Sequence, residues 1–308
     1  MGKASKDKRD VFYRKAKEEG WRARSAYKLL QIDEAFDIFT GVEHAVDLCA
    51  APGSWSQVLS RKLYLPALRA GSPCPPTIVA VDLQPMAPIE GVVQLQGDIT
   101  SESTAQQVIS HFHGRPADLV VCDGAPDVTG LHDLDEYVQA QLLLAAASIT
   151  CAVLRRGGTF VAKIFRGKDV ALLYAQLKLL FPEVYVAKPK SSRNSSIEAF
   201  VVCRRFDPPP GLAGPGALQA LLAGGAEAYF GAAGSPDGEP HHVDPVNAPL
   251  LARAVPFLSC GDLSGGDADR SYDLDPATYV PLDPVQPPTA PNYKTAIARV
   301  RTGQQQGG

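Results

Sequence analysis

The chain has 308 residues, of which 45% are hydrophobic, and its formal net charge of −3 corresponds to an isoelectric point near 6.1. This composition indicates a protein that is globular at least in part, with one large domain or two small ones. The six cysteines show no Cys-x-x-Cys or Cys/His ligand spacing, so no disulfide framework or metal site is expected. A membrane span is not expected either, because no run of about 18 apolar residues occurs.

The charge is unevenly distributed along the chain. Residues 1–28 carry ten Lys or Arg against four acids, a local charge of +6, whereas residues 207–308 carry five basic and eleven acidic residues. A basic head of this kind favours binding to an anionic polymer such as nucleic acid. The N-terminus is charged from Lys3 onward and has no apolar signal segment, so the expected compartment is the cytosol, with the nucleus as an alternative.

The first predicted elements are two basic helices. From Val11 to Phe36, apolar and aromatic residues recur at helical spacing, with a break at Gly20. The alternative is a solvated charged face without a helix pair. Residues 1–40 are therefore predicted to form basic N-terminal helices that belong to the same domain as the core that follows them.

After Gly41, short apolar runs alternate with longer amphipathic segments. The predicted strands are HAVDLCA, TIVAVDL, GVVQLQGD, ADLVVCD, TFVAKIF, EVYVAKP and AFVVCRR. Helical patterns such as DEYVQAQLLLAAASITCAVL and KDVALLYAQLKLLF separate most of them. This alternation predicts an α/β, Rossmann-like core over residues 41–206, with a seven-stranded, mostly parallel sheet. The last two strands are joined by a loop too short for a crossover, so the last strand should be antiparallel.

Two segments depart from this alternation. Residues 61–77 carry four prolines and are predicted to be a surface insertion between a helix and a strand. Residues 207–308 hold 15 of the 26 prolines and 14 of the 27 glycines, which predicts an acidic, largely disordered tail. Within this tail, residues 255–274 mix apolar and acidic side chains and could form a docking segment.

The loop in DLCAAPGSWSQ follows the first predicted strand and leads into a helix. Open α/β sheets bind ligands at such positions, and the small residues up to Gly53 let the backbone approach a bound molecule. The loop has neither the phosphate-loop pattern nor the G-x-G-x-x-G fingerprint. A bare structural turn remains the alternative.

Acidic residues follow three of the predicted strands. Asp82, Asp98 and Asp123 follow the second, third and fourth strands, where single acids often serve as helix caps or turn residues. Together beside a glycine loop, however, they could accept hydrogen bonds from the ribose hydroxyls and adenine amino group of a nucleoside. The predicted ligand is an adenosine derivative, and S-adenosylmethionine fits because it needs no phosphate cradle.

The motifs DLCAAPGSWSQ, DLVVCDGAPDVTG, FVAKIFRG and KPKSSRNSSIEAF together resemble those of FtsJ/RrmJ-type RNA 2′-O-methyltransferases, over about residues 5–206. The resemblance implies an S-adenosylmethionine-dependent enzyme. The implied catalytic tetrad is Lys28, Asp123, Lys163 and Glu198. The implied cofactor-binding residues are Gly53, Trp55, Asp82, Asp98 and Asp123.

Two segments, DVTGLHDLDEY and residues 255–274, resemble the eukaryotic branch that modifies the tRNA anticodon loop. The resemblance implies methylation of nucleotide 34, the wobble position, and of nucleotide 32. It also implies auxiliary partner proteins, including a WD-repeat protein. Ribosomal RNA or an mRNA cap remains an alternative substrate. A non-catalytic RNA-binding scaffold and, more remotely, a nicotinamide oxidoreductase are the alternatives from other classes.

The sequence also predicts roles for basic residues. We expect Lys163 to be the general base, with its pKa lowered by burial and by the ammonium of Lys28, while Asp123 and Glu198 orient the two lysines. Lys188 is also expected to contact phosphate groups of RNA. The other expected RNA-binding residues are Arg22, Arg24, Arg166, Lys168, Lys190 and Arg193. Tyr13, Trp21 and Tyr27 could stack on a base, although packing between helices is the alternative.

Overall fold

The computed structural model describes residues 10–126, 132–167, 170–209, 255, 257–261, 282 and 285. Lys168, residues 1–9 and most of the predicted tail lie outside these residues, so the predictions made for them stay predictions. The N-terminal pair of helices is present as α2 (Val11–Glu18) and α3 (Ala26–Phe36). Between them Gly20 has a φ of 71°, a left-handed conformation that glycine adopts without strain.

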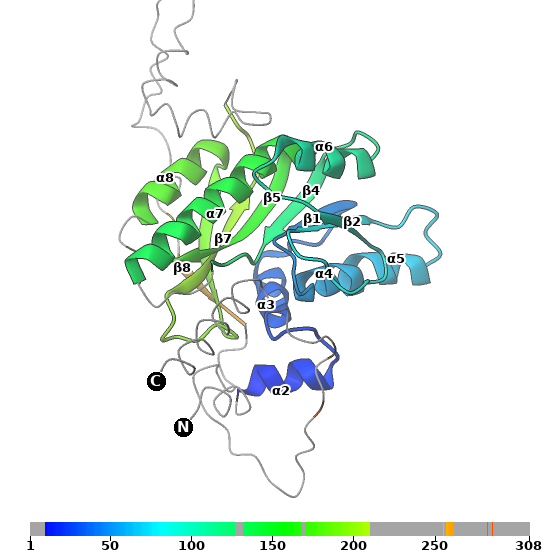
Figure 1. Ribbon diagram of the computed structural model, residues 1–308, viewed down its shortest axis with the longest axis horizontal. Helices are drawn as coiled ribbons and strands as arrows, with labels where there is room; N and C mark the ends of the chain where they lie inside the picture. The colour runs from blue at the N-terminus through cyan, green and yellow to red at the C-terminus, as the bar shows by residue number, and fades with distance from the viewer. Residues whose placement is uncertain are drawn as a thin grey trace, which may run out of the picture.

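One sheet forms the centre of the molecule, with strand order β3-β2-β1-β4-β5-β7-β6-β8 (Figure 1). The strands are β1 (His44–Leu48), β2 (Thr77–Asp82), β3 (Val92–Gln96), β4 (Ala117–Cys122), β5 (Leu154–Phe165), β6 (Glu183–Pro189), β7 (Glu198–Arg204) and β8 (Phe257–Cys260). β1 to β5 pair in parallel, whereas β7 is antiparallel to both β5 and β6. The antiparallel last strand of the predicted core is therefore confirmed.

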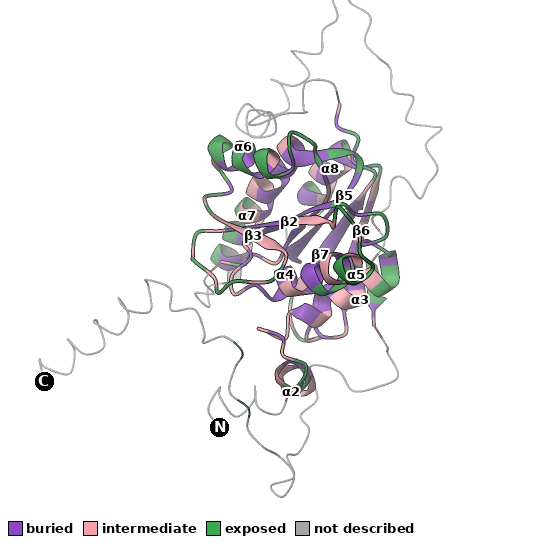
Figure 2. Cartoon of the chain, turned by 90° about the vertical axis from the view of Figure 1, so that its right-hand side faces the viewer, coloured by how far each residue is buried: buried purple, intermediate pink, exposed green. Residues whose placement is uncertain are grey.

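Helices cover both faces of the sheet (Figure 1). One face carries α6 (Glu102–His111), α7 (His132–Val153) and α8 (Val170–Leu180), which pack on residues such as Val79 and Phe160. The other face carries α3 and α4 (Ser54–Leu59), which pack on residues such as Val161 and Phe200. The central strands β1, β2, β4 and β7 are buried over most of their length, whereas the edge strands β3 and β8 are partly exposed (Figure 2), as expected for a parallel sheet covered on both sides.

The long helix α7 belongs to this core. By length and composition its stretch Leu134–Val153 could cross a membrane, and 50% of it is buried inside the fold. Such burial is what a helix packed against a sheet shows, and α7 lies along β5. Packing on the sheet therefore accounts for the buried half of this stretch, whereas Leu134, Tyr137 and Val138 near its start are exposed.

The predicted insertion at residues 61–77 is helical in its first half. α4 continues as a π-helix (Ser60–Tyr64) and then as α5 (Leu65–Arg69), with Pro66 as the second residue of α5. Leu63 is buried, and the ring of Tyr64 lies against Gly91. The prolines that follow, up to residue 76, form the connection to β2.

Within the described residues the sheet has eight strands rather than the seven predicted. β8 comes from the segment predicted to dock, and it pairs in parallel with β6, with Val186 opposite Phe257 and Pro189 opposite Cys260. Cys260 is buried in the same hydrophobic cluster as α3. The described part of residues 255–274 therefore docks on the sheet of its own chain.

Candidate active site

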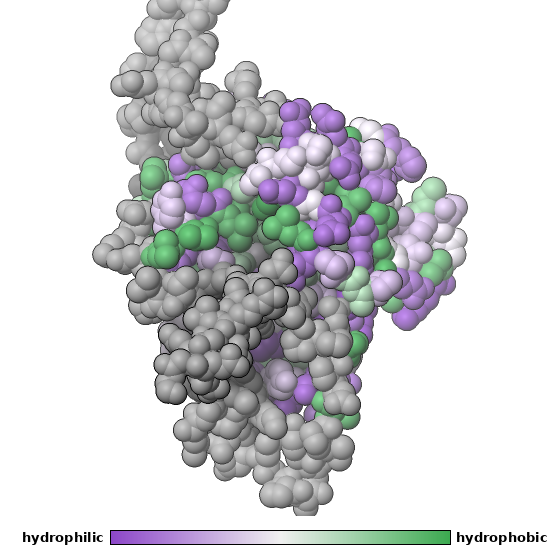
Figure 3. Space-filling view, in the orientation of Figure 1, coloured by the Kyte–Doolittle hydropathy of each residue, from purple (hydrophilic) through white to green (hydrophobic). Residues whose placement is uncertain are grey.

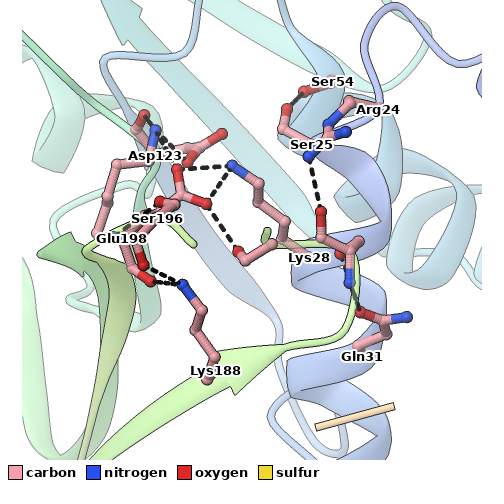
Figure 4. Close-up of polar contacts among 12 residues, drawn as sticks. Arg24, Ser25, Lys28, Gln31, Ser54, Asp123, Lys188, Ser196 and Glu198 are labelled. Carbon is pink, nitrogen blue, oxygen red and sulfur yellow. Dashed lines mark hydrogen bonds and ion pairs between the residues drawn. The ribbon is translucent and has the colours of Figure 1, made fainter. Parts of the chain in front are cut away.

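The four residues of the predicted tetrad meet at one edge of the sheet. Lys28 lies on α3, Asp123 directly follows β4, Lys163 lies on β5, and Glu198 begins β7. Because β5 and β7 are antiparallel neighbours, Glu198 pairs with Phe165, close to Lys163 on the same strand. Figure 4 shows Lys28, Asp123 and Glu198 directed towards one another.

Glu198 bridges the two ammonium groups. Lys28 Nζ lies 2.8 Å from Oε1 of Glu198 and 2.8 Å from Oε2. Lys163 Nζ lies 2.7 Å from Asp123 Oδ1 and 3.7 Å from Glu198 Oε2, and it donates a hydrogen bond of 2.8 Å to the Asp123 carbonyl. Two lysines and two carboxylates thus form one cluster that is neutral when all four are ionised.

This cluster is largely removed from water. Lys28 and Lys163 are only 7% and 8% exposed. A buried ammonium is tolerated where carboxylates and carbonyl oxygens compensate for lost hydration. The alternative that Lys163 is a strand lysine extending to solvent is therefore wrong, because its Nζ is held by Asp123 inside the site.

The predicted lowering of the Lys163 pKa is wrong for this structure. Burial acts to lower the pKa of Lys163, but the carboxylates of Asp123 and Glu198 outweigh it, so the pKa is raised above its usual value. Burial alone would raise the pKa of Glu198, yet the ammonium groups of Lys28 and Lys163 hold it well below its usual value. Both side chains are therefore charged at neutral pH in this state of the site.

The loop between β1 and α4, residues 49–53, lies at the same edge of the sheet. Gly53 has a φ of 99°, and a Cβ there would lie 2.7 Å from Arg22 Nη1 and 2.8 Å from the Ile89 side chain. Only glycine fits this position without displacing its neighbours. The Ala51 N–H donates a 2.8 Å hydrogen bond to Asp82, which ties the loop to the end of β2.

Two of the three strand-end acids, Asp82 and Asp98, accept hydrogen bonds from nearby backbone or hydroxyl groups, whereas the Asp123 carboxylate pairs with Lys163. Asp82 accepts from the N–H groups of Ala51 and Gln84, and Asp98 accepts from the N–H and hydroxyl of Thr100. Their roles in turns, weighed as the alternative, are therefore real. Each carboxylate has about four acceptor sites, so these bonds leave capacity for a ligand's hydroxyl or amino groups.

Trp55 is in the core rather than in the loop. Its side chain is 1% exposed, its ring centroid lies 5.6 Å from that of Phe200, and its Nε1–H donates to the Ser25 carbonyl at 2.9 Å. The Ser25 and Ser54 hydroxyl oxygens, 2.5 Å apart, form a second link between α3 and α4 (Figure 4). The Trp55 side chain is therefore not available to a cofactor, and only its main-chain atoms, in the first turn of α4, could contact one.

Most of the arginines predicted to bind RNA make contacts within the protein. Arg22 donates to the carbonyls of Pro52 and Pro88, at 3.0 and 2.9 Å, and so braces the β1–α4 loop. Arg24 forms an ion pair with the buried Asp10 and donates to the Ser191 carbonyl.

Arg193 approaches Asp10 to 3.9 Å, and the Arg166 guanidinium lies 4.8 Å from the ring centroid of Phe257. The main-chain N–H of Lys190 bonds to Cys260. These contacts fix the basic residues around the site, and their predicted contact with RNA is untested.

The aromatic residues of the N-terminal segment include two that serve packing. Trp21 is buried, and the guanidinium carbon of Arg61 lies 4.0 Å from the centroid of the Trp21 ring. The rings of Phe12 and Tyr27 are 5.5 Å apart. Packing between helices, the alternative to base stacking, is what these contacts show.

Several residues that hold the site were missed or misassigned from sequence. Lys188, predicted to contact RNA, is instead buried, and its Nζ donates to the carbonyls of Ser196 and Glu198. Gln139 of α7 donates to the carbonyls of Gly124 and Lys163, and the Ser192 hydroxyl donates to Glu198 Oε1 at 2.7 Å. Their types carry no signal, because a polar residue in a helix or loop is ordinarily at the surface.

A metal site is not indicated by the described residues. Within them, no group of three or more His, Cys, Asp or Glu side chains is arranged to hold a metal ion. The acidic residues of the site are instead paired with lysines or backbone N–H groups.

Comparison with known proteins agrees with this geometry. Residues 21–206 match the model of the FtsJ-like methyltransferase family. The tRNA (cytidine(32)/guanosine(34)-2′-O)-methyltransferase of Mus musculus is 57% identical over 99% of this chain and 88% of its own length. The protein of that name from Schizosaccharomyces pombe is 56% identical over 96% of this chain and 97% of its own length.

A solved structure described as a ribosomal RNA methyltransferase from Plasmodium falciparum shares the fold. It covers 60% of this chain and 98% of its own, with 23% identity and a TM-score of 0.51. The family match spans α3 to β7, and so it includes all four members of the tetrad and the β1–α4 loop. The chain belongs to the FtsJ-like methyltransferase family.

Proposed function

We propose that this chain transfers a methyl group to the ribose 2′-hydroxyl of nucleotides 32 and 34 in the tRNA anticodon loop. The observation that carries the proposal is the convergence of Lys28, Asp123, Lys163 and Glu198 beside the β1–α4 loop. The curated relatives, similar over nearly the whole chain, bear the name of this activity. Similarity at this level over the full length favours tRNA over ribosomal RNA or an mRNA cap.

Methyltransferases of this family take the methyl group from S-adenosylmethionine, which supplies an electrophilic methyl carbon on a sulfonium. The residues present fit this molecule. The loop that ends at Gly53 offers small residues, and the carboxylates of Asp82 and Asp98 can accept hydrogen bonds from ribose hydroxyls and an adenine amino group. No basic side chain is needed there, because the cofactor has no phosphate.

Lys163 is the proton acceptor in this proposal. A ribose hydroxyl must lose its proton as it attacks, and the Lys163 amine lies at the centre of the cluster. Asp123 and Glu198 orient this amine, and Lys28 holds Glu198 in place. Because the pKa of Lys163 is raised, only a small fraction of the amine is neutral at neutral pH. The rate should therefore increase as the pH rises towards that pKa.

Auxiliary proteins, including a WD-repeat protein, are proposed to direct the enzyme to each nucleotide, and the cytoplasm is the proposed location. The start of α7, which includes the end of the segment resembling the anticodon-loop branch, supports a docking role. Leu134, Tyr137 and Val138 are exposed there, with 63% of Tyr137 accessible. Hydrophobic side chains lie along this helix in Figure 3.

The reaction is tested by transfer of labelled methyl from S-adenosylmethionine to unmodified tRNA, with and without candidate auxiliary proteins. Nuclease digestion then locates the label. We expect label at nucleotides 32 and 34 and its loss in Lys163→Met, with the exposed Lys62→Met as the matched control. Transfer to ribosomal RNA but not to tRNA would overturn the proposed substrate and keep the chemistry. An absence of transfer to any RNA would favour a non-catalytic scaffold.

The role of Lys163 is tested by the pH dependence of the rate. Glu198→Gln removes one carboxylate beside Lys163 and leaves the Lys28 charge uncompensated, so both effects lower the pKa of Lys163. The rise of log kcat with pH should move to lower pH by about one unit, whatever the change in the maximum rate. A rise that stays at the wild-type pH would show that Lys163 is not the group that titrates.

A further inference from the structure

The C-terminal strand β8 ends beside the loop between β6 and β7, residues 190–197. Pro189 at the end of β6 lies opposite Cys260 at the end of β8. The N–H of the next residue, Lys190, donates a 2.8 Å hydrogen bond to the Cys260 carbonyl. β8 therefore supplies a backbone partner for the first residue of this β6–β7 loop. Ser191 and Ser192 of this loop are buried, and buried backbone groups outside helices and strands depend on hydrogen bonds of this kind.

Gln31 connects β8 with the next residue of the β6–β7 loop. Gly261, directly after β8, has a φ of +95°, and a Cβ there would lie 2.8 Å from Cδ and Nε2 of Gln31. The Oε1 atom of Gln31 accepts hydrogen bonds from the Ser191 N–H at 3.0 Å and from its hydroxyl at 2.9 Å. Gly261 thus leaves the space in which the Gln31 side chain lies, and Gln31 in turn holds Ser191.

The β6–β7 loop reaches the catalytic carboxylate through the following residue. Ser191 and Ser192 are both fully buried, and the Ser192 hydroxyl donates to Glu198 Oε1 at 2.7 Å. Lys28, which also binds this carboxylate, lies one helical turn before Gln31 on α3 (Figure 4). Gln31 therefore connects β8 to the same helix that carries a tetrad lysine.

We propose that β8, Gly261 and Gln31 position the Glu198 carboxylate through Ser191 and Ser192. Residues 257–261 then belong to the catalytic domain, although they follow β7 by more than 50 residues in the chain. Gln31 and Gly261 contact neither of the tetrad carboxylates, so they are positioning residues. The kinetic consequence rests on the proposed function, whereas the consequence for the mobility of the β6–β7 loop does not.

Two substitutions in the full-length chain test this proposal. Gln31→Leu removes the acceptor for Ser191 and keeps a side chain of similar size. Gly261→Val places a branched side chain where Gln31 lies, at a φ that valine disfavours. The matched control is Ser259→Val, which changes an exposed residue of the same strand and suits a β-strand.

The first measurement is hydrogen exchange of the amides of residues 190–197. Losing one hydrogen-bond partner should accelerate exchange of this segment by roughly tenfold in Gln31→Leu and in Gly261→Val, but not in Ser259→Val. Wild-type exchange in both variants would overturn the proposal. Because exchange is read without RNA, it decides the role of β8 even where the wild-type chain transfers no methyl to tRNA.

The second measurement separates positioning from stability. We expect kcat for methyl transfer to fall roughly five- to tenfold in Gln31→Leu, with the KM for S-adenosylmethionine unchanged. The rise of log kcat with pH should also move to lower pH, the direction expected for Glu198→Gln. A lower melting temperature with an unchanged kcat and pH profile would overturn the proposal, because β8 would then only cover the edge of the sheet.

Discussion

Replacing Asp47 with asparagine tests the electrostatics beneath the β1–α4 loop. Asp47 lies on β1 and is fully buried, and its Oδ2 accepts a 2.5 Å hydrogen bond from the Ser56 hydroxyl. Burial is the largest cause that raises its pKa to about 8, and the carboxylates of Asp123 and Asp82 add to it. The side chain is thus expected to be protonated at neutral pH in the folded protein.

The sign of the pH dependence follows from the two pKa values. The unfolded chain loses the Asp47 proton near pH 3.8, whereas the folded chain keeps it to about pH 8. The contribution of Asp47 to stability is therefore fully present below pH 3.8 and falls as the pH rises towards 8. A difference of about four pKa units, at about 1.4 kcal/mol each, sets an upper limit of roughly 6 kcal/mol on this loss.

Asparagine has the shape of a protonated aspartate but never ionises. Within the described residues, Oδ1 of Asp47 has no hydrogen-bond partner. The side-chain amide group of an asparagine placed there would therefore be buried without a partner, which lowers the stability by about 1–3 kcal/mol. Asp47→Asn should therefore be less stable than wild type by about 2 kcal/mol near pH 4 and more stable by about 3 kcal/mol near pH 8.

Urea unfolding followed by tryptophan fluorescence measures this change in sign. The control is Asp118→Asn, whose carboxylate has a lowered pKa because hydrogen bonds from Arg155 and the backbone outweigh its burial. Its stabilising contribution is present above the unfolded pKa, so the difference between Asp118→Asn and wild type should vary much less between about pH 5 and 8 than that of Asp47→Asn, with a small variation from His44, 4.0 Å from Asp118. A similarly small variation for Asp47→Asn would show that Asp47 is already ionised in the folded protein.

Two further substitutions concern the β1–α4 loop. Arg22→Met keeps the length of the side chain but removes the bonds to Pro52 and Pro88, so calorimetry should show roughly tenfold weaker binding of S-adenosylmethionine; a change confined to the KM for tRNA would instead support the predicted contact with RNA. Asp82→Asn should weaken cofactor binding by roughly 10- to 100-fold, because one acceptor and the charge are lost; unchanged affinity in the same titration would contradict its predicted role.

The sheet could be predicted because its signals are local, whereas the tetrad residues were implied by the family resemblance. Alternating strands and helices specify a parallel sheet, and the carboxyl ends of its strands meet at one edge. Asp123 and Lys163 each lie in an apolar run that reads as a strand, so their convergence follows from the topology. Glu198 joins them because β7 is antiparallel to β5, which the short preceding loop required.

β8 could not be predicted, because its partner is not specified locally. Phe257–Cys260 is a strand of four residues within a segment rich in proline and glycine, and it pairs with a strand that lies about 70 residues earlier in the chain. The composition of the segment therefore predicted that it could dock, but not that it would dock on β6. The sequence also gave no indication that Lys188 turns inward, since its partners are carbonyl oxygens that every residue carries.

The direction of the pKa shift of Lys163 could not be predicted from the identity of the site residues alone. Burial and the neighbouring ammonium of Lys28 favour a neutral lysine, whereas two carboxylates favour a charged one, and the balance depends on distances. Glu198 lies between the two lysines and compensates the charge of Lys28, which leaves Asp123 at 2.7 Å to raise the pKa of Lys163. For the proposed role of Lys163 as proton acceptor, the residues that hold Asp123 and Glu198 in place therefore matter as much as the lysine itself, because they set the distances that determine its pKa.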